Sequence, residues 1–347
     1  MHRILFYSVI ILLVVLVFAF VDFFIYRLLR IILSKASAQI TNYVLLAVFF
    51  LLIGISTWWG HTHTRLQIAV THSDILSSRI PSAFDGFRIV QISDLHLDSF
   101  SKEEGHAFLS NLVGTIQSQE PDLIVFTGDI VTLRAAQLLP YTTELAALGN
   151  IPHKDGQNTV PVYSILGNHD YADYVHNFTP ERRQKDIDSL LMLQDQAGWK
   201  MLRNSSVFLE RFNDNDSIPQ QIGLVGVENI GEPPFSVYGD LELAMGNIGG
   251  IQAANSFFTI LLSHNPTHWR SEVIPRTSID LTLSGHTHAT QILIGSWSPA
   301  KWKYDEWMGL YTDGQQKLYV NTGIGCVGPK VRIGIAPEVS VLTLRKN

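Results

Sequence analysis

The chain has 347 residues, a formal net charge of −6 and a single cysteine, Cys326. An acidic chain without a run of basic residues lacks the surface that grips a nucleic-acid backbone, so we expect no nucleic-acid partner. One cysteine excludes an internal disulfide and a cysteine-rich zinc site. The length suffices for one large domain or two small ones behind an apolar N-terminal segment.

Two apolar runs lie within residues 1–60. Residues 4–26 are almost all apolar, and a helix that rises about 1.5 Å per residue would cross a hydrocarbon core of roughly 30 Å. Residues 43–59 form a second run that ends in Trp58-Trp59, a pair suited to the membrane–water interface. We therefore predict an anchor of two transmembrane helices, and thus an integral membrane protein with the bilayer as a partner.

Two alternatives remain for this anchor. One is a single spanning helix followed by an interfacial helix, and the other is a signal peptide cleaved at residues 36–38 (Ala-Ser-Ala). The first run is too long for a signal peptide, and Arg27, Arg30 and Lys35 lie between it and that site. The positive-inside rule places this basic loop in the cytoplasm and the downstream domain outside a bacterial inner membrane.

Residues 61–81 form a polar connector, in which residues 66–70 are a candidate strand, and residues 82–347 form the predicted catalytic domain. Apolar runs typical of buried strands lie at residues 87–93, 122–127, 160–166, 222–227, 257–262, 279–283 and 317–320. Amphipathic residues 103–119 and 182–196 predict helices between them. Strands that alternate with helices indicate a βαβ architecture, in which ligands bind beyond the carboxyl ends of the strands.

Five of these runs end in side chains that bind metals. The motifs are Ser93-Asp94-Leu95-His96, Gly128-Asp129, Gly167-Asn168-His169-Asp170, Ser263-His264 and Gly285-His286-Thr287-His288. An isolated Asp-x-His or Gly-Asp is more often a turn. Together, however, the motifs supply more carboxylates, amide oxygens and imidazoles than one ion can use. They predict two adjacent divalent ions, an arrangement that cleaves phosphoesters.

In this order the motifs resemble the signature of the calcineurin-like metallophosphoesterase superfamily, which is Asp-x-His, Gly-Asp, Gly-Asn-His-Asp/Glu, a single His, and Gly-His-x-His. The resemblance covers roughly residues 89–342 and implies an α/β fold, a four-layer αββα sandwich of two mixed sheets. Residues 319–325 resemble a branch of membrane-linked or exported bacterial phosphoesterases. That branch includes a UDP-2,3-diacylglucosamine hydrolase of lipid A synthesis, and its members often carry Arg where this chain has Thr322.

The resemblance also implies a role for each motif residue. The first ion would be held by Asp94, His96, Asp129 and His288. The second ion would be held by Asp129, Asn168, His264 and His286, so that Asp129 bridges the two. His169 would lie beside the scissile phosphate, with Asp170 orienting its ring.

Charge explains why such a site would attract a phosphate. Two divalent ions outweigh the carboxylates of Asp94 and Asp129, so a net positive charge remains. Water on such ions loses a proton near neutral pH, and the resulting hydroxide can attack phosphorus in line. His169 could stabilise the transition state or protonate the leaving oxygen. The nitrogen and oxygen ligands suit Mn²⁺, Fe or Zn²⁺ without selecting among them.

The predicted function is a membrane-anchored phosphoesterase that hydrolyses phosphodiester, pyrophosphate or phosphomonoester bonds, with lipid-linked substrates among the options. One alternative is a pyrophosphate hydrolase of a nucleotide-linked lipid A precursor at the cytoplasmic face. Another, of a different class, is a non-catalytic membrane-tethered scaffold on the same fold. Candidate substrate contacts are Arg332, Asn229 and Trp302.

Overall fold

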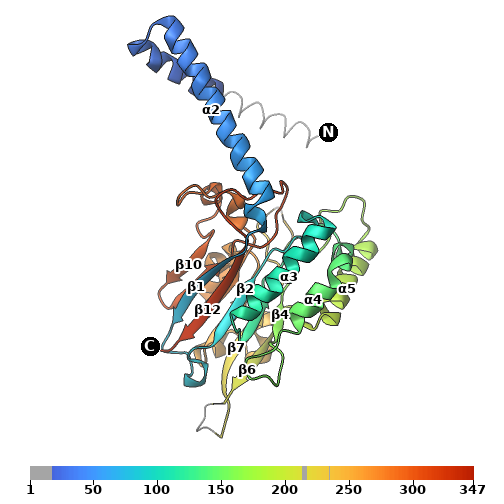
Figure 1. Ribbon diagram of the computed structural model, residues 1–347. Coiled ribbons are helices and arrows are strands. Elements are labelled where there is room, and N and C mark those ends of the chain that lie inside the picture. The colour runs from blue at the N-terminus through green and yellow to red at the C-terminus, as the bar shows by residue number, and fades with distance from the viewer. Residues whose placement is uncertain (1–17, 213–216, 234) are drawn as a thin grey trace. The chain divides into compact units, whose positions relative to one another are not determined.

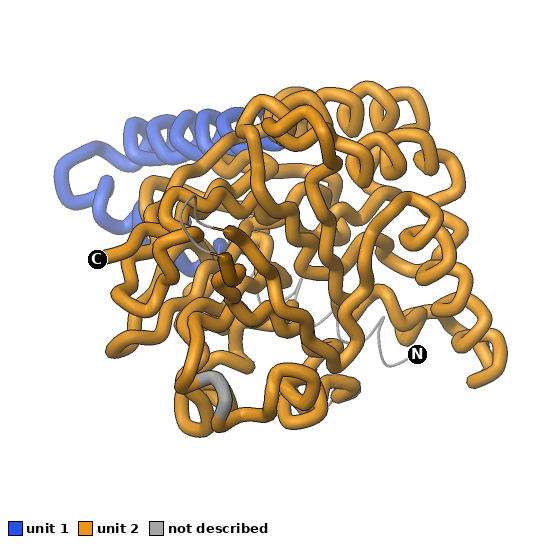
Figure 2. Tube along the Cα trace, turned by 90° about the horizontal axis from the view of Figure 1, so that it is seen from below, with its two compact units in different colours: residues 1–59 blue, residues 60–347 orange. Residues whose placement is uncertain are grey.

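The computed structural model describes residues 18–212, 217–233 and 235–347. The chain divides into a helical unit, residues 1–59, and a sheet unit, residues 60–347 (Figure 2). Most of the first predicted membrane helix, residues 4–17, lies outside the described residues, and residues 18–32 are helical. Helix α2 (Lys35–Thr62) contains the second apolar run and extends beyond it at both ends.

Two features shape the helical unit. The Ser37 amide donates to the Ser34 hydroxyl at 3.2 Å, which caps the start of α2. Asn42 Nδ2 donates to Asp22 Oδ1 at 2.7 Å, which joins the two helical stretches through a polar contact. Among the described residues, one helical stretch, Lys35–Leu66, is long and apolar enough to cross a membrane by length and composition. The prediction of two spanning helices is therefore supported for one of them.

The sheet unit is built on two mixed six-stranded sheets, as the resemblance implies (Figure 1). The first sheet contains, in spatial order, β1 (Ala69–Leu76), β12 (Glu338–Arg345), β2 (Arg88–Ile92), β3 (Leu123–Phe126), β4 (Val162–Ser164) and β5 (Trp199–Met201). The second contains β10 (Gly309–Asp313), β11 (Gln316–Val320), β9 (Leu281–Ser284), β8 (Thr259–Leu262), β7 (Gln220–Gly226) and β6 (Ser205–Arg211).

The main helices cover the first sheet: α3 (Lys102–Ser118), α4 (Thr142–Gly149) and α5 (Pro180–Gln196) (Figure 1). A capping box between Ser101 and Glu104 starts α3, and Phe108, Leu112 and Ile116 form its buried stripe. The outer face of the second sheet packs on short helices, which include α6 (Leu241–Ala244) and α7 (Ile274–Arg276). The layering is thus αββα, with the main helices in one outer layer and short helices in the other.

The core between the sheets is apolar. Side chains of both sheets interleave there, among them Ile89, Val125, Leu224, Ile260 and Leu283. These strands read as continuous apolar runs because each is covered on both faces. Burial on both faces also leaves the strand ends as the places where polar side chains can gather.

The predicted connector contains a strand. Residues 69–76 form β1, which pairs in parallel with β12 along its whole length, from Ala69 opposite Glu338 to Leu76 opposite Arg345. Alternating burial along β1 explains why its sequence looked polar: one face of this edge strand is exposed. The folded domain therefore begins well before residue 82.

One glycine sets the spacing of the two sheets. A Cβ on Gly226 would lie 2.4 Å from Leu202 Cβ and 2.8 Å from Ile165 Cγ2. We predict that Gly226→Ala lowers the free energy of unfolding by about 1–3 kcal/mol, because the extra methyl forces the core apart. Gly114→Ala, at an open position in α3, should instead stabilise by roughly 0.5–1 kcal/mol. Denaturant unfolding of both variants measures these changes, and changes of the same sign in the free energy of unfolding would contradict the prediction.

Candidate metal centre

The seven predicted metal ligands converge beyond the carboxyl ends of β2, β3, β4, β8 and β9. Parallel pairing of β2, β3 and β4 in one sheet, and of β7, β8, β9 and β11 in the other, brings those ends to one edge. Buried Gln91 ties the two sheets together beneath that edge, since its Nε2 donates to Ser284 O at 2.8 Å. The motifs therefore meet because the topology aligns the strand ends.

The ligands form two groups. The first comprises Asp94, His96 and His288, and the second comprises Asp129, His264 and His286. Within each group the potential ligand atoms lie within 4.8 Å of one another. Each group is part of one of the two predicted four-ligand sets, and each contains one carboxylate and two imidazoles.

Asp129 lies between the groups. Its Oδ2 is 3.6 Å from His96 Nε2 in the first group and 3.1 Å from His264 Nε2 in the second. Asn168 Oδ1 adds an amide oxygen to the second group, 3.1 Å from His264 Nε2 and 2.9 Å from His286 Nδ1. This geometry is what a bridging carboxylate requires.

The nitrogen atoms that face the centre suit cations. His96 Nε2 and His288 Nε2 are buried and have no hydrogen-bond partner among the described residues. The opposite nitrogen of His96 lies 3.0 Å from Thr132 Oγ1, and that of His264 lies 2.7 Å from Thr127 O. Such outer contacts fix the ring so that the other nitrogen presents a lone pair inward. Buried lone pairs beside two carboxylates fit divalent ions.

The ligand loops adopt unusual backbone conformations. Asp94, His96, Asp129, His286 and His288 all have positive φ angles, between 38° and 73°. Such conformations cost about 1–3 kcal/mol each for residues other than glycine and gather at functional sites. The loops after β2 and β3 hold each other, since the Asp94 amide donates to the Gly128 carbonyl at 2.9 Å.

Two glycines let the carboxylates approach. A Cβ on Gly167 would lie 2.2 Å from Asp129 Oδ1, and a Cβ on Gly285 would lie 2.2 Å from Asp94 Oδ2. Any side chain there would displace the carboxylate that it meets. This close approach explains why the motifs read Gly-Asn-His-Asp and Gly-His-x-His.

Burial and neighbouring charges shift the pKa values of the centre. Burial lowers the pKa of His96 and that of His286 to about 3, so both rings are neutral, the form that binds metals. Burial would also lower the pKa of His264, but the Asp129 carboxylate raises it to about 9. Conversely, His264 and His169 hold the pKa of Asp129 well below its usual range, although burial opposes this.

His169 lies beside Asp129 and is not a member of either ligand group. Its amide donates to Asp129 Oδ1 at 2.8 Å, and its ring Nδ1 lies 2.7 Å from Thr132 O. Its ring packs 5.0 Å from that of His96 and 4.6 Å from that of Tyr174. The predicted position next to the centre thus agrees with the structure.

The expected role of Asp170 is corrected. Its carboxylate accepts the amides of Asp129, Ile130 and Val131 at 2.8, 3.0 and 3.2 Å, and that of Gly167 at 2.9 Å. It therefore shapes the loop that carries Asp129. The ring of His169 is oriented instead by the Thr132 carbonyl.

Arg332 and Trp302 also lie elsewhere than expected. Arg332 is fully buried, and its guanidinium donates to the carbonyls of Thr322, Gly323 and Gly325 at 3.1, 2.9 and 2.7 Å. Buried carbonyls satisfy it, so it supports the loop beside His288 and does not line the pocket. Trp302 is 79% exposed and lies outside the pocket.

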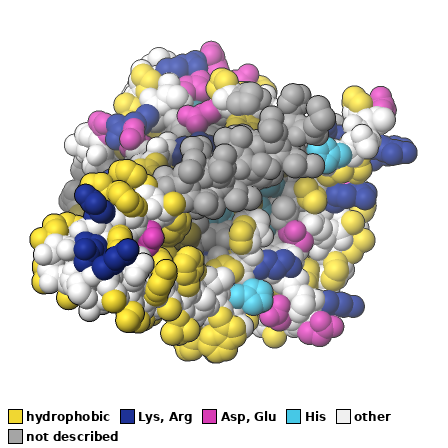
Figure 3. All heavy atoms as spheres, turned by 90° about the horizontal axis from the view of Figure 1, so that it is seen from above, with side chains coloured by type: hydrophobic (Ala, Val, Ile, Leu, Met, Phe, Trp, Pro, Cys, Tyr) yellow, Lys and Arg dark blue, Asp and Glu magenta, His cyan; other side chains and the backbone are white. Residues whose placement is uncertain are grey.

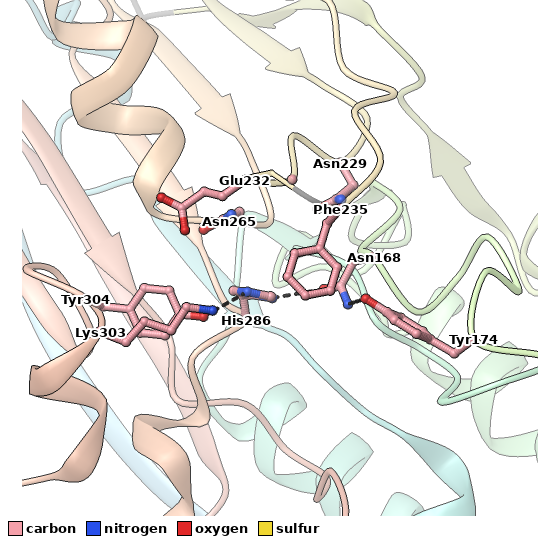
Figure 4. A pocket seen from close by; sticks show the side chains of 10 residues that line it. Asn168, Tyr174, Asn229, Glu232, Phe235, Asn265, His286, Lys303 and Tyr304 are labelled. Atoms are coloured by element: carbon pink, nitrogen blue, oxygen red, sulfur yellow. Dashed lines mark hydrogen bonds between the residues drawn. The ribbon is translucent and has the colours of Figure 1, made fainter. Parts of the chain in front are cut away.

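A pocket of about 110 Å³ opens beside the second ligand group (Figure 4). Its lining includes Asn168 and His286 from the centre, and the predicted Asn229. Pattern reasoning missed the remaining side chains, which are Tyr174, Glu232, Phe235, Asn265, Lys303 and Tyr304. They come from loops without a motif, and only Asn265 has a sequence signal, since it directly follows His264.

Tyr304 and Tyr174 connect this pocket to the centre. The Tyr304 hydroxyl lies 3.2 Å from His286 Nε2, and Asn168 Nδ2 donates to the Tyr174 hydroxyl at 2.8 Å (Figure 4). Both tyrosines thus position metal-ligand candidates from the pocket side. A second pocket shares Asn168, Asn229 and Phe235 and adds Arg183.

Comparisons with known proteins agree with this geometry. Residues 87–290 match the family model of the calcineurin-like phosphoesterases. The uncharacterized metallophosphoesterase YkuE of Bacillus subtilis is 31% identical over 81% of this chain and 87% of its own length. UDP-2,3-diacylglucosamine pyrophosphatase LpxG of Chlamydia muridarum is 26% identical over 82% of this chain and 91% of its own.

A third relative, from Bos taurus, is a transmembrane protein with a metallophosphoesterase domain. It is 28% identical over 80% of this chain, which covers 57% of the relative. The family model spans more than half of the chain, and the similarity to YkuE extends over most of both proteins. The chain therefore belongs to the calcineurin-like phosphoesterase family and is a hydrolase of that class.

Proposed function

We propose that this chain is a membrane-anchored phosphoesterase that works with two divalent metal ions. The observation that carries this proposal is the convergence of two ligand groups on Asp129, with His169 alongside. Asp94, His96, Asp129 and His288 would hold one ion, and Asp129, Asn168, His264 and His286 the other. When bound, such a pair offsets phosphate charge and lowers the pKa of water.

The chain's own residues supply positioning and proton transfer. Asp129 would contribute to holding both ions, because one of its oxygens lies near both ligand groups. His169 lies beside Asp129, and its Nδ1–H donates to Thr132 O, so Nε2 is the nitrogen that would transfer a proton to the leaving oxygen. Burial of the centre strengthens each of these charge interactions.

The anchor supports a substrate in or near a membrane. Helix α2 is long and apolar enough to span a bilayer, and the bovine relative is named as a transmembrane protein. The basic residues Arg27, Arg30 and Lys35 favour a cytoplasmic loop before α2, which places the sheet unit on the extracytoplasmic side.

The pocket favours a substrate with a second anionic group. Lys303 lines the pocket, packs 4.9 Å from the Tyr304 ring, and has no carboxylate partner among the described residues. Asn229 Oδ1 is buried there without a hydrogen-bond partner, and it could accept from a hydroxyl or amine. Hydrolysis of the pyrophosphate bond of UDP-2,3-diacylglucosamine, the activity in the name of the Chlamydia relative, is the second candidate function.

We predict that Asp129→Ala and His169→Ala both lose activity for different reasons. Removal of Asp129 takes a ligand from both groups, so metal analysis should show loss of bound ions. Removal of His169 should lower kcat about 10²- to 10⁴-fold while both ions remain, because a proton donor is lost. His72→Ala, at an exposed histidine of β1, is the control. Unchanged hydrolysis of a chromogenic phosphodiester by both variants would refute this mechanism, whereas no hydrolysis by the metal-loaded natural chain would favour the scaffold alternative.

We predict that Lys303→Gln separates substrate classes. The KM for a pyrophosphate diester should rise about fivefold, because a partly exposed charge pair contributes about 1 kcal/mol. The KM for a monoester without a second anionic group should stay constant. Lys301→Gln, at an exposed lysine outside the pocket, is the matched control. Equal effects of both substitutions on both substrates would contradict a specific role.

We predict that a topology reporter fused after Asn347 gives an extracytoplasmic signal, as the basic loop before α2 requires. Exchanging Arg27, Arg30 and Lys35 for glutamine should weaken that signal. A cytoplasmic reporter signal from the chain with its natural loop would contradict this orientation and favour the nucleotide-linked lipid substrate.

A further inference from the structure

Among the exposed hydrophobic side chains of the sheet unit, three lie together. Trp302 is 79% exposed, Ile294 is 63% exposed and Trp297 is 38% exposed. The rings of Trp297 and Trp302 contact each other edge to face at 5.3 Å, and Ile294 pairs with Trp297 through two backbone hydrogen bonds. We call these three residues the aromatic lip. Contiguous exposed apolar groups mark interaction surfaces, and tryptophan is enriched where a protein meets a bilayer interface.

The lip rests on a built platform. The Ile294 and Trp297 amides and carbonyls close a tight hairpin, with exposed Gly295 and Ser296 at its tip. Behind it, the Ser298 hydroxyl donates to Ala289 O at 2.6 Å and accepts from the Ala300 amide at 3.1 Å. Ala289 and Ala300 belong to a small buried cluster with Tyr304 and Trp307. The lip is therefore held outward by packing beneath it.

The base of the lip and the entry of the chain share one support. The Leu293 amide donates to Ile333 O at 2.8 Å, and Gln291 Nε2 donates to Val331 O at 3.0 Å. The same segment contacts the start of the sheet unit, since the Arg332 amide donates to Gly60 O at 3.4 Å and His61 Nδ1 lies 2.8 Å from Lys330 O. In sequence, Gly60 directly follows Trp58-Trp59.

The sheet register places this entry at the metal end. Ala69, the first residue of β1, pairs with Glu338, the first residue of β12. Strand β12 runs antiparallel to β2, so its start lies beside the carboxyl end of β2, where Asp94 follows. The lip, the chain entry and the metal centre therefore share one end of the sheet unit. Figure 3 shows the molecule from above, with histidine, hydrophobic and basic side chains coloured by type.

The lip also adjoins the pocket. Trp302 lies between two exposed lysines, Lys301 and Lys303, and Lys303 and Tyr304 line the pocket beside His286. Basic side chains that flank exposed tryptophan suit an anionic bilayer surface, which attracts lysine electrostatically while the indole rings enter the interface. This charge pattern favours lipid over a second copy of the chain, because lysines facing their own copies would repel.

We propose that the aromatic lip inserts into the bilayer interface and holds the mouth of the metal pocket at the level of the lipid headgroups. A phosphate on a lipid would then reach the centre without leaving the membrane. This inference rests on the proposed membrane anchoring and adds a second contact with the bilayer, made by the catalytic domain itself.

The test uses the full chain in vesicles of phosphatidylethanolamine and phosphatidylglycerol. Cys326→Ser removes the only natural thiol, and Ser296→Cys places an environment-sensitive fluorophore at the tip of the lip hairpin. Gln157→Cys is the matched control, because this exposed turn neighbours His153 and thus Asp122, at the opposite ends of the strands. Contact with the bilayer is measured as quenching of the fluorophore by lipids that carry a quencher near the headgroup.

We expect a blue shift and quenching at position 296 and neither at position 157. Both signals should be lost when Trp297 and Trp302 are changed to serine, while hydrolysis of a water-soluble phosphodiester is retained. A label at position 296 that is no more quenched than the one at position 157 would overturn the proposal. A blue shift at position 296 that persists in detergent, together with no quenching by the lipids in vesicles, would also overturn the proposal, in favour of a dimer contact.

Flotation of the vesicles measures anchoring independently of the label. A chain that floats without quenching at position 296 disproves the lip contact and leaves the anchor intact. A chain that does not float disproves the anchoring on which the proposal rests. Phosphodiester hydrolysis in the same samples reports on the catalytic proposal, so the three failures are distinguishable.

Discussion

The metal centre depends on one unfavourable concentration of charge. Asp94 and Asp129 are buried with the imidazoles of both ligand groups around them, and water cannot screen them there. Bound cations would turn this arrangement from costly to stabilising. The rest of the site serves that concentration: Asp170 holds the Asp129 loop through four backbone amides, and glycines leave space for the carboxylates.

Strand-end motifs could be predicted from sequence because strands buried on both faces have a strong apolar signal, and the residues directly after such strands must lie at the sheet edge. The positions of Asp94, His264 and His288 agree with that rule. Hydrogen-bond partners could not be predicted in this way. Asp170 and Arg332 turn toward backbone amides and carbonyls, a choice that depends on loop geometry and not on residue spacing.

The residues that line the pocket could likewise be predicted only in part. Asn229 follows a strand and lines the cavity as expected, whereas Lys303 and Tyr304 reach it from a segment without a motif. The edge strand β1 was predicted only in part, at residues 66–70, because alternation over a single exposed strand resembles a connector. Segments whose position depends on tertiary packing thus escape pattern reasoning even when their neighbours obey it.

The pairing of β1 with β12 has a consequence for biosynthesis. These strands are neighbours in the sheet although Ala69 and Glu338 are separated by most of the polypeptide. The emerging chain must therefore leave the β12-facing hydrogen-bonding groups of β1 unsatisfied until β12 has been synthesised, and such late closure slows folding. A nascent domain in that condition presents an unpaired strand edge to its neighbours, which exposes it to misassembly.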